Sequence, residues 1–251
     1  KALLRSSAGI AVAMAVMNVA TYAFQMISAR LLGPTEYGAV ASLMALLMVV
    51  AVLQLGLQAT GARRISAEPE HVAQIERMVL RVTYRAALGL GLLMMALAPV
   101  VHHVLRLDSV VPALLLAVSA VPLTIMGGQA GVLQGERRWF SLAGIYLAMG
   151  LGRVVVGTAC IVVSPTESAA MLGVMIAMFA PALVGWLALR RPGLHVRDGD
   201  RHSDQHTARR VVTETGSASL ALLAFFVLSN LDIVVARNVL DAHDAGLYAA
   251  G

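Results

Sequence analysis

Charge, aromatic residues and cysteine are all scarce in this sequence of 251 residues. Charged residues make up 13% and hydrophobic residues 59%, whereas soluble domains are about one quarter charged and about half apolar. So little charge cannot coat a 26.3 kDa globule in water, which excludes an ordinary soluble domain, a disordered chain and a collagen-like fibre. The 5% aromatic share and the lack of short alternating strands argue against an outer-membrane barrel. A helical membrane protein remains.

Motifs of catalysis and metal binding are also missing. Cys160 is the one cysteine and lies in an apolar run, which excludes a disulfide framework and a multi-cysteine metal site. His102 and His103 stand beside Arg106, but a metal site needs more ligands. No Ser/His/Asp triad, P-loop or dinucleotide fingerprint occurs. We therefore expect neither an enzyme nor a cofactor.

Long apolar runs dominate what is present. A spanning helix needs about 20 mostly apolar residues, and seven segments qualify: 8–29, 37–59, 86–105, 109–134, 139–163, 168–189 and 211–236. An eighth helix is expected to begin near Ala245. Short polar turns at 33–36, 106–108 and 164–167 predict antiparallel helical hairpins. The sequence thus predicts an all-α polytopic transmembrane bundle.

Two polar stretches interrupt this pattern. Apolar residues recur at near-helical spacing between arginines in 60–85, which suggests an amphipathic helix at the membrane surface leading into the third span. The stretch 190–210 is clearly soluble in composition and predicts a cytoplasmic linker. We therefore expect a six-helix lobe at 1–189, the linker, and the first hairpin of a second lobe at 211–251. Because the chain starts without Met and stops in an apolar run, we also expect a fragment.

The distribution of Lys and Arg indicates an orientation. With seven spans, fifteen of the nineteen basic residues fall on one side of the membrane and three on the other, with Arg153 inside a span. Basic residues concentrate in cytoplasmic loops, so the N-terminus is predicted to be cytoplasmic. Topology accounts for the net charge of +5, and no nucleic-acid partner is needed.

A weak internal repeat relates the two predicted lobes. Under a shift of 208 residues, Leu32, Gly38 and Ala41 fall on Leu240, Gly246 and Ala249, and Glu36 falls on Asp244. In both copies a span ends, turns, and re-enters through a glycine. Parallel repeats of this kind build transporters whose halves rock around a central cavity.

Three short motifs carry a resemblance to a known family. The Ala-Arg-Leu-Leu-Gly-Pro-Thr-Glu-Tyr-Gly turn at 29–38 resembles the signature of polysaccharide biosynthesis proteins, the lipid-linked oligosaccharide flippases of the multidrug/oligosaccharidyl-lipid/polysaccharide (MOP) exporter superfamily. The Leu-Gln-Gly-Glu-Arg-Arg-Trp-Phe turn at 133–140 is similar to that family's glycine-basic-aromatic turn. The end of the seventh span at 230–235, with 245–248, resembles the start of its second half. In the second copy Asp241-Ala242 replaces the Gly-Pro pair.

The resemblance covers nearly the whole chain and implies a function. It implies a MOP-exporter-like fold with 12 or 14 spans in two lobes, which moves undecaprenyl-linked glycans across the cytoplasmic membrane. Membrane lipids and proteins of glycan polymerisation or assembly are the further partners expected. The alternatives are a drug or cation antiporter of the same superfamily and a non-transporting membrane scaffold of glycan assembly.

Two ionisable residues inside spans are candidates for function. A guanidinium near the bilayer centre costs from about 2.5 kcal/mol upward, so Arg153 should face a wet cavity or a partner. It could engage the pyrophosphate of the substrate, or pair structurally with Asp232. Asp232 could alternatively bind a coupling ion, or be an acid at a helix end near the interface.

Polar side chains also gather on single faces of the first two spans. Asn18, Thr21, Tyr22 and Gln25 share one face of the first span, and Gln54 and Gln58 are four residues apart in the second. Such faces either line a cavity or join helices through hydrogen bonds. Asn18, Tyr22, Gln25, Gln54 and Gln58 are therefore candidate substrate-binding residues with Arg153.

Overall fold

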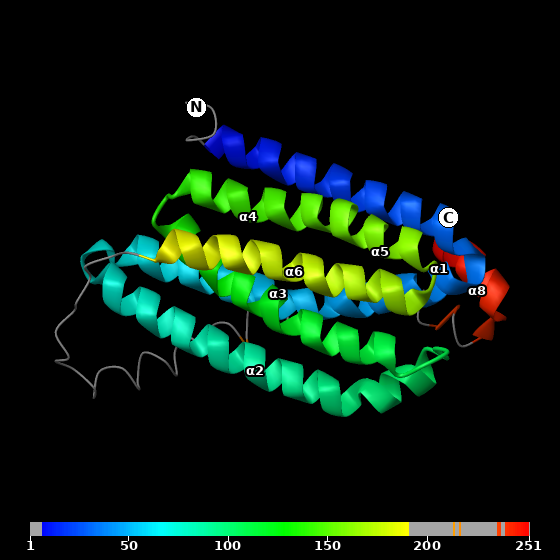
Figure 1. The fold of residues 1–251 in the computed structure, drawn as a ribbon. Coiled ribbons are helices and arrows are strands. Elements are labelled where there is room, and N and C mark those ends of the chain that lie inside the picture. The colour runs from blue at the N-terminus through cyan, green and yellow to red at the C-terminus, as the bar shows by residue number, and fades with distance from the viewer. Residues whose placement is uncertain (1–6, 191–212, 214–215, 217–234, 237–238, 251) are drawn as a thin grey trace.

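The computed structural model describes residues 7–190, 213, 216, 235–236 and 239–250 (Figure 1). These residues form helices α1 (Ser7–Ala67), α2 (Val72–Val104), α3 (Val111–Gly135), α4 (Trp139–Gly152), α5 (Thr158–Val163), α6 (Glu167–Leu189) and α8 (Ala242–Ala250), with one 3₁₀ turn, η2 (Pro69–His71), and one π-helical turn, η3 (Arg153–Gly157). No strand occurs in the described part. Five stretches are long and apolar enough to cross a membrane: Ala8–Ala67, Pro69–Val104, Val111–Gly135, Trp139–Val163 and Glu167–Leu189. The predicted all-α transmembrane bundle is confirmed, and the protein is a multi-pass membrane protein.

Helix α1 comprises two helical spans that are joined at a sharp turn. Its 61 residues would extend about 90 Å if straight, but the chain turns back within α1 (Figure 1), and the non-helical residue is Gly33. Gly33 has φ 75° and ψ 171°, a conformation that is essentially restricted to glycine. Pro34 follows and starts the second half, where its missing N–H is no loss. The described part therefore contains six spans, at the places that the sequence predicts.

The prediction of a surface helix over 60–85 is wrong. Residues up to Ala67 complete α1, and residues from Val72 onward belong to one unbroken helix of 33 residues, α2. The apolar positions were identified correctly, since Ile75 and Val79 are buried. They pack against Ile65 of α1 and Val132 of α3, so the amphipathic stripe faces the bundle and not the plane of a membrane.

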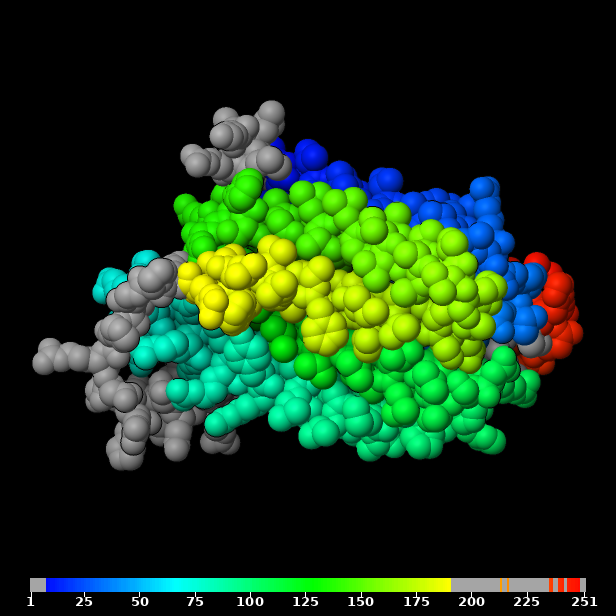
Figure 2. Space-filling model, viewed as in Figure 1, coloured from blue at the N-terminus to red at the C-terminus, as the bar shows by residue number. Residues whose placement is uncertain are grey.

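Helix α3 forms the centre of the bundle and is the most buried of the spans. It packs against α1, α2 and α6, and α6 covers the visible face between α4–α5 and α2 (Figure 2). Glycines allow the close approach of α1: a Cβ at Gly127 would overlap the backbone of Gln54, and one at Gly131 would overlap the backbone of Gln58. Gln54 and Gln58 of the second span are thereby held close to α3.

The hairpins gather most of the described arginines at one end of the bundle. One end, here called the basic end, holds the described residues Arg63, Arg64, Arg77, Arg81, Arg137, Arg138 and Arg190. The opposite end holds the turns around Gly33, Asp108 and Pro165. Leu189 at the end of α6 packs against the cluster of Ile65, Ile75 and Val79 at the basic end.

The helix expected near Ala245 is α8, which begins at Ala242. Under the shift of 208 residues Ala242 corresponds to Pro34, so both copies start a helix at the same place. Gly246 lies against Pro34, and a Cβ there would overlap the Pro34 carbonyl. The linker beyond Arg190 and nearly all of the seventh span lie outside the described residues, so the boundaries at 189, 190–210 and 211 stay predictions.

Candidate substrate-binding site

Arg153 is a buried cation in the middle of a span. Only 8% of the residue is exposed. Its Nη2 atom lies 3.9 Å from the Sδ atom of Met178 on α6, a weak acceptor. Its Nε atom has no hydrogen-bond partner, and no acid among the described residues forms an ion pair with it. The guanidinium thus keeps unused capacity to bind an anion.

The helix changes its winding at Arg153. Residues Arg153–Gly157 form one π-helical turn between α4 and α5, a feature that is frequent at functional sites. Thr158 follows this turn, and its Oγ1 atom is likewise buried without a partner. The absence of a side chain at Gly157 lets the π-helical turn pack closely against the first span. A Cβ at Gly157 would overlap the ring of Phe24. Arg153 therefore lies inside the lobe, in a segment that packs against the first span and α6.

A second polar group joins three helices near the basic end. The Nε2 atom of Gln58 donates to the Oε1 atom of Gln134 on α3 at 2.9 Å and to the hydroxyl of Tyr146 on α4 at 2.8 Å. Gln54 donates its Nε2–H to the Oε1 atom of Gln58 at 3.1 Å. Gln58 is half-buried and Tyr146 is buried. The four side chains form one hydrogen-bonded network, here called the glutamine network.

The polar face of the first span points away from both groups. Asn18 and Tyr22 are exposed, Tyr22 by 64%, and Gln25 is half-buried. The opposite face, with Ala13, Ala20 and Phe24, is buried in the lobe. In the described part of the chain, Asn18, Tyr22 and Gln25 therefore line an outer surface of the lobe.

The structure distributes the predicted site residues over three places: the exposed face of the first span, the glutamine network, and the interior around Arg153. Asp232 lies outside the described residues. Sequence reasoning missed Gln134 and Tyr146 as members of the network, although Gln134 lies within the motif at 133–140. It also missed Thr83 and Gln129, whose Oγ1 and Oε1 atoms are buried without partners.

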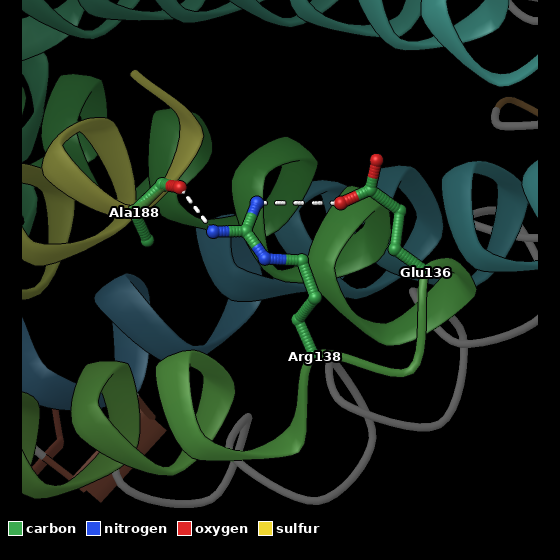
Figure 3. A network of polar contacts seen from close by, with 3 residues as sticks. All are labelled: Glu136, Arg138 and Ala188. Carbon is green, nitrogen blue, oxygen red and sulfur yellow. Dashed lines mark hydrogen bonds and ion pairs between the residues drawn. The ribbon is translucent and has the colours of Figure 1, made fainter. Parts of the chain in front are cut away.

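Arg138 joins two helices at the basic end through contacts with Glu136 and Ala188, here called the arginine clamp. Arg138 donates to the carbonyl oxygen of Ala188 near the C-terminus of α6, and its Nη1 atom lies 3.3 Å from the Oε2 atom of Glu136 (Figure 3). A cation at the end of a helix complements the negative end of its dipole. The turn between α3 and α4 is thereby tied to the last turn of α6.

Carboxylates join the turns at the opposite end. The Oε2 atom of Glu36 accepts the backbone N–H of Glu167 at 2.6 Å, and the Oε1 atom of Glu167 accepts the backbone N–H of Asp108 at 3.2 Å. Glu167 is 4% exposed. The three turns of this end are thus joined by hydrogen bonds that main-chain N–H groups donate to carboxylates.

Two of the solved structures with the same fold are described as membrane transporters. The chain is similar to a multidrug resistance MATE family transporter of the MOP superfamily in an inward-facing conformation, with a TM-score of 0.73 and 14% identity over 94% of this chain and 56% of that one. An outward-facing MATE family transporter gives a TM-score of 0.67 and 17% identity over 99% and 62%. A protein described as protein A gives 0.78 and 15% over 98% and 58%. No curated protein sequence matches the chain.

These likenesses define the fold as that of the MOP superfamily transporters, and the chain spans 56–62% of the length of those three structures. The family model for "Polysaccharide biosynthesis protein" matches residues 3–251. The chain belongs to this polysaccharide biosynthesis protein family, as the motif at 29–38 predicts.

Proposed function

We propose that the chain is part of a flippase that moves lipid-linked oligosaccharide or polysaccharide precursors across the cytoplasmic membrane. The observation that carries this proposal is the match of the polysaccharide biosynthesis family model to residues 3–251. Undecaprenyl-linked glycan is the proposed substrate, and two lobes would admit it from alternate sides. The basic end would face the cytoplasm, as would the N-terminus, because basic residues concentrate in the cytoplasmic loops of membrane proteins.

Arg153 is the residue proposed to engage the anionic headgroup. A lipid-linked glycan precursor carries phosphate, and a guanidinium binds phosphate through two parallel hydrogen bonds while keeping its charge. The unpaired Nε atom, and the weak acceptor Sδ of Met178 as the contact of Nη2, support this role. Because Arg153 is buried in the described conformation, the headgroup would reach it in the state in which the first span and α6 separate.

The remaining candidates have supporting roles in this proposal. Asn18, Tyr22 and Gln25 would line the glycan route, because their face of the first span is exposed. Gln54 and Gln58 would contact the glycan separately from that face, inside the lobe near the basic end. Asp232 would bind a coupling ion. Proteins of glycan polymerisation and assembly are the proposed partners.

The test is complementation of a flippase-null strain by the intact protein. Arg153→Ala and Arg153→Met should abolish surface glycan without lowering the protein level in the membrane. Arg153→Met also tests whether Arg153 takes part in a structural ion pair. Replacing an unpaired buried charge by an apolar side chain is neutral or stabilising, so the unfolding temperature of this variant should not fall. Arg137→Gly is the matched control, because Arg137 is exposed and has φ 58°. It should restore normal glycan.

Different failures have different meanings. Normal surface glycan with Arg153→Met contradicts the role of Arg153 and leaves the flippase proposal standing. A large loss of stability in Arg153→Met indicates a structural pair. Failure of the unaltered protein to restore glycan, together with efflux of cationic dyes, identifies a cation antiporter instead.

A further inference from the structure

Tyr146 and Arg153 lie on the same face of α4, inside the lobe. They are seven residues apart in the sequence, and a helix of 3.6 residues per turn brings such a pair to within about 20° of each other around its axis. The residues between them are α-helical, so Arg153 lies about 10 Å farther from the basic end than Tyr146. Each of the two residues is 8% exposed. One buried face of α4 therefore presents a phenol and a guanidinium.

Gln58 orients the hydroxyl of Tyr146 and the side-chain amide of Gln134. Its Nε2 atom donates to the Tyr146 hydroxyl oxygen at 2.8 Å and to the Oε1 atom of Gln134 at 2.9 Å. Because the Tyr146 oxygen accepts this bond, its own proton is directed elsewhere. Among the described residues, no acceptor takes that proton or the N–H groups of Gln134 Nε2. The hydroxyl and the amide thus keep oriented donors for a ligand.

The chemistry of the glutamine network differs from that of Arg153. Its amide and phenol groups are uncharged at neutral pH, and they both donate and accept hydrogen bonds. A hydroxyl group also donates and accepts, so a sugar, which carries several hydroxyl groups on one ring, matches such a network. The guanidinium of Arg153 instead matches a phosphate. The two sets of groups therefore fit the two polar parts of a lipid-linked sugar.

The order of the two sets along α4 matches the order of these parts in the proposed substrate. In a lipid-linked sugar, the phosphate lies between the lipid chain and the first sugar. In the leaflet at the basic end, the sugar is then nearer to that end than the phosphate. Tyr146 is likewise nearer to the basic end than Arg153, by about 10 Å.

The first span covers this face of α4 in the described conformation. Gly150 lies between Tyr146 and Arg153 in the sequence, and a Cβ there would overlap the backbone of Met17 on the first span. Movement of the first span away from α4 would therefore uncover Tyr146 together with Arg153. A single conformational change makes both accessible to one substrate molecule.

We propose that Gln134 and Tyr146 form a sugar subsite, which binds hydroxyl groups of the sugar joined directly to the phosphate while Arg153 binds the phosphate. This inference rests on the proposed flippase function, from which it takes the class of substrate. Gln58 positions both groups of the subsite through its two N–H bonds. A site built to hydrogen-bond a hydroxyl group discriminates against an analogue that lacks it, so the lobe should distinguish lipid phosphates with and without a sugar.

The test measures the binding of defined lipids to the intact protein, purified in detergent. The probes are undecaprenyl phosphate and its forms with glucose, galactose or N-acetylglucosamine joined to the phosphate. At least one sugar-bearing probe should bind more tightly than undecaprenyl phosphate. Tyr146→Phe and Gln134→Leu should each weaken that binding by about 2- to 10-fold, as the loss of a neutral hydrogen bond implies, and leave the affinity for undecaprenyl phosphate unchanged. Arg153→Met should weaken the binding of every probe.

Two matched controls make the same chemical changes outside the glutamine network. Tyr84→Phe removes the hydroxyl of an exposed tyrosine on α2, and Gln74→Leu replaces a half-buried glutamine on the same helix. Both variants should bind all probes as the unaltered protein does. The unfolding temperature without lipid is measured for every variant, because a purely structural role of the network would appear there.

The possible failures are distinguishable. If Tyr146→Phe and Gln134→Leu lower the unfolding temperature but keep the preference for the sugar-bearing probe, the network only joins helices and the sugar subsite is refuted. If the unaltered protein binds all probes equally and Arg153→Met weakens them all, the subsite is refuted while the flippase proposal stands. If no probe binds, both proposals are contradicted. Should Tyr146→Phe not fold, Gln134→Leu decides the question, because Gln134 is half-buried in the last turn of α3.

Discussion

At the scale of single residues, Gly33 decides whether the first two spans form a hairpin. The chain there combines a positive φ with extended ψ, which a side chain opposes through contact with its own backbone. Apart from its chain neighbours and the adjacent backbone of α1, no atom lies within 4 Å of a Cβ built at Gly33. Glycine is therefore required at position 33 because of the backbone conformation alone.

Replacing Gly33 by alanine should therefore destabilise the protein by about 1–3 kcal/mol. The matched control is Gly89→Ala on α2, where a Cβ also meets nothing within 4 Å but the backbone is helical. Alanine should stabilise that position by up to about 1 kcal/mol. Thermal unfolding in detergent measures both, and equal unfolding temperatures of the two variants would contradict this account of the turn.

At the scale of elements, the arginine clamp explains the family motif at 133–140. Arg138 is oriented by Glu136 and reaches the last turn of α6, while the neighbouring Arg137 is exposed. Two adjacent arginines of the same motif therefore differ in what they contribute to folding.

Arg138→Ala should lower the free energy of unfolding by about 1.5–3 kcal/mol, because it removes hydrogen bonds made by a charged group. Arg137→Ala should change it little beyond the strain of its positive φ, and Arg137→Gly should not destabilise the fold. Chemical or thermal unfolding of the three variants tests this order, and an equal effect of Arg137→Gly and Arg138→Ala would refute it.

Apolar length predicted the spans well, because burial in lipid depends on composition over about 20 residues. The same reasoning failed for 60–85, because a helical apolar stripe does not tell whether it faces a membrane or another helix. The π-helical turn at Arg153 has no local sequence signal, since it results from packing against Phe24 and α6. The glutamine network joins residues that are 76 and 88 positions apart, so only the pair of Gln54 and Gln58 was visible.

At the scale of the whole molecule, the distribution of arginine predicts which end faces the cytoplasm. In a Cys160→Ser background, Ser66→Cys places a thiol at the basic end and Thr35→Cys places one at the opposite end, both at exposed positions. A maleimide that cannot cross membranes should label Thr35→Cys in intact cells and Ser66→Cys only after permeabilisation. The reverse pattern would invert the proposed orientation, and labelling of both in intact cells would contradict the hairpin topology.

The acid-to-backbone bonds at the end opposite the arginines have an evolutionary consequence. Glu36 and Glu167 accept main-chain N–H groups from positions 167 and 108, and every amino acid except proline supplies such a donor. Position 108 can therefore take any residue except proline while its bond survives, and no compensating change is selected at its partner. Contact maps inferred from covarying positions in aligned homologues would under-represent the joint that holds these three turns together.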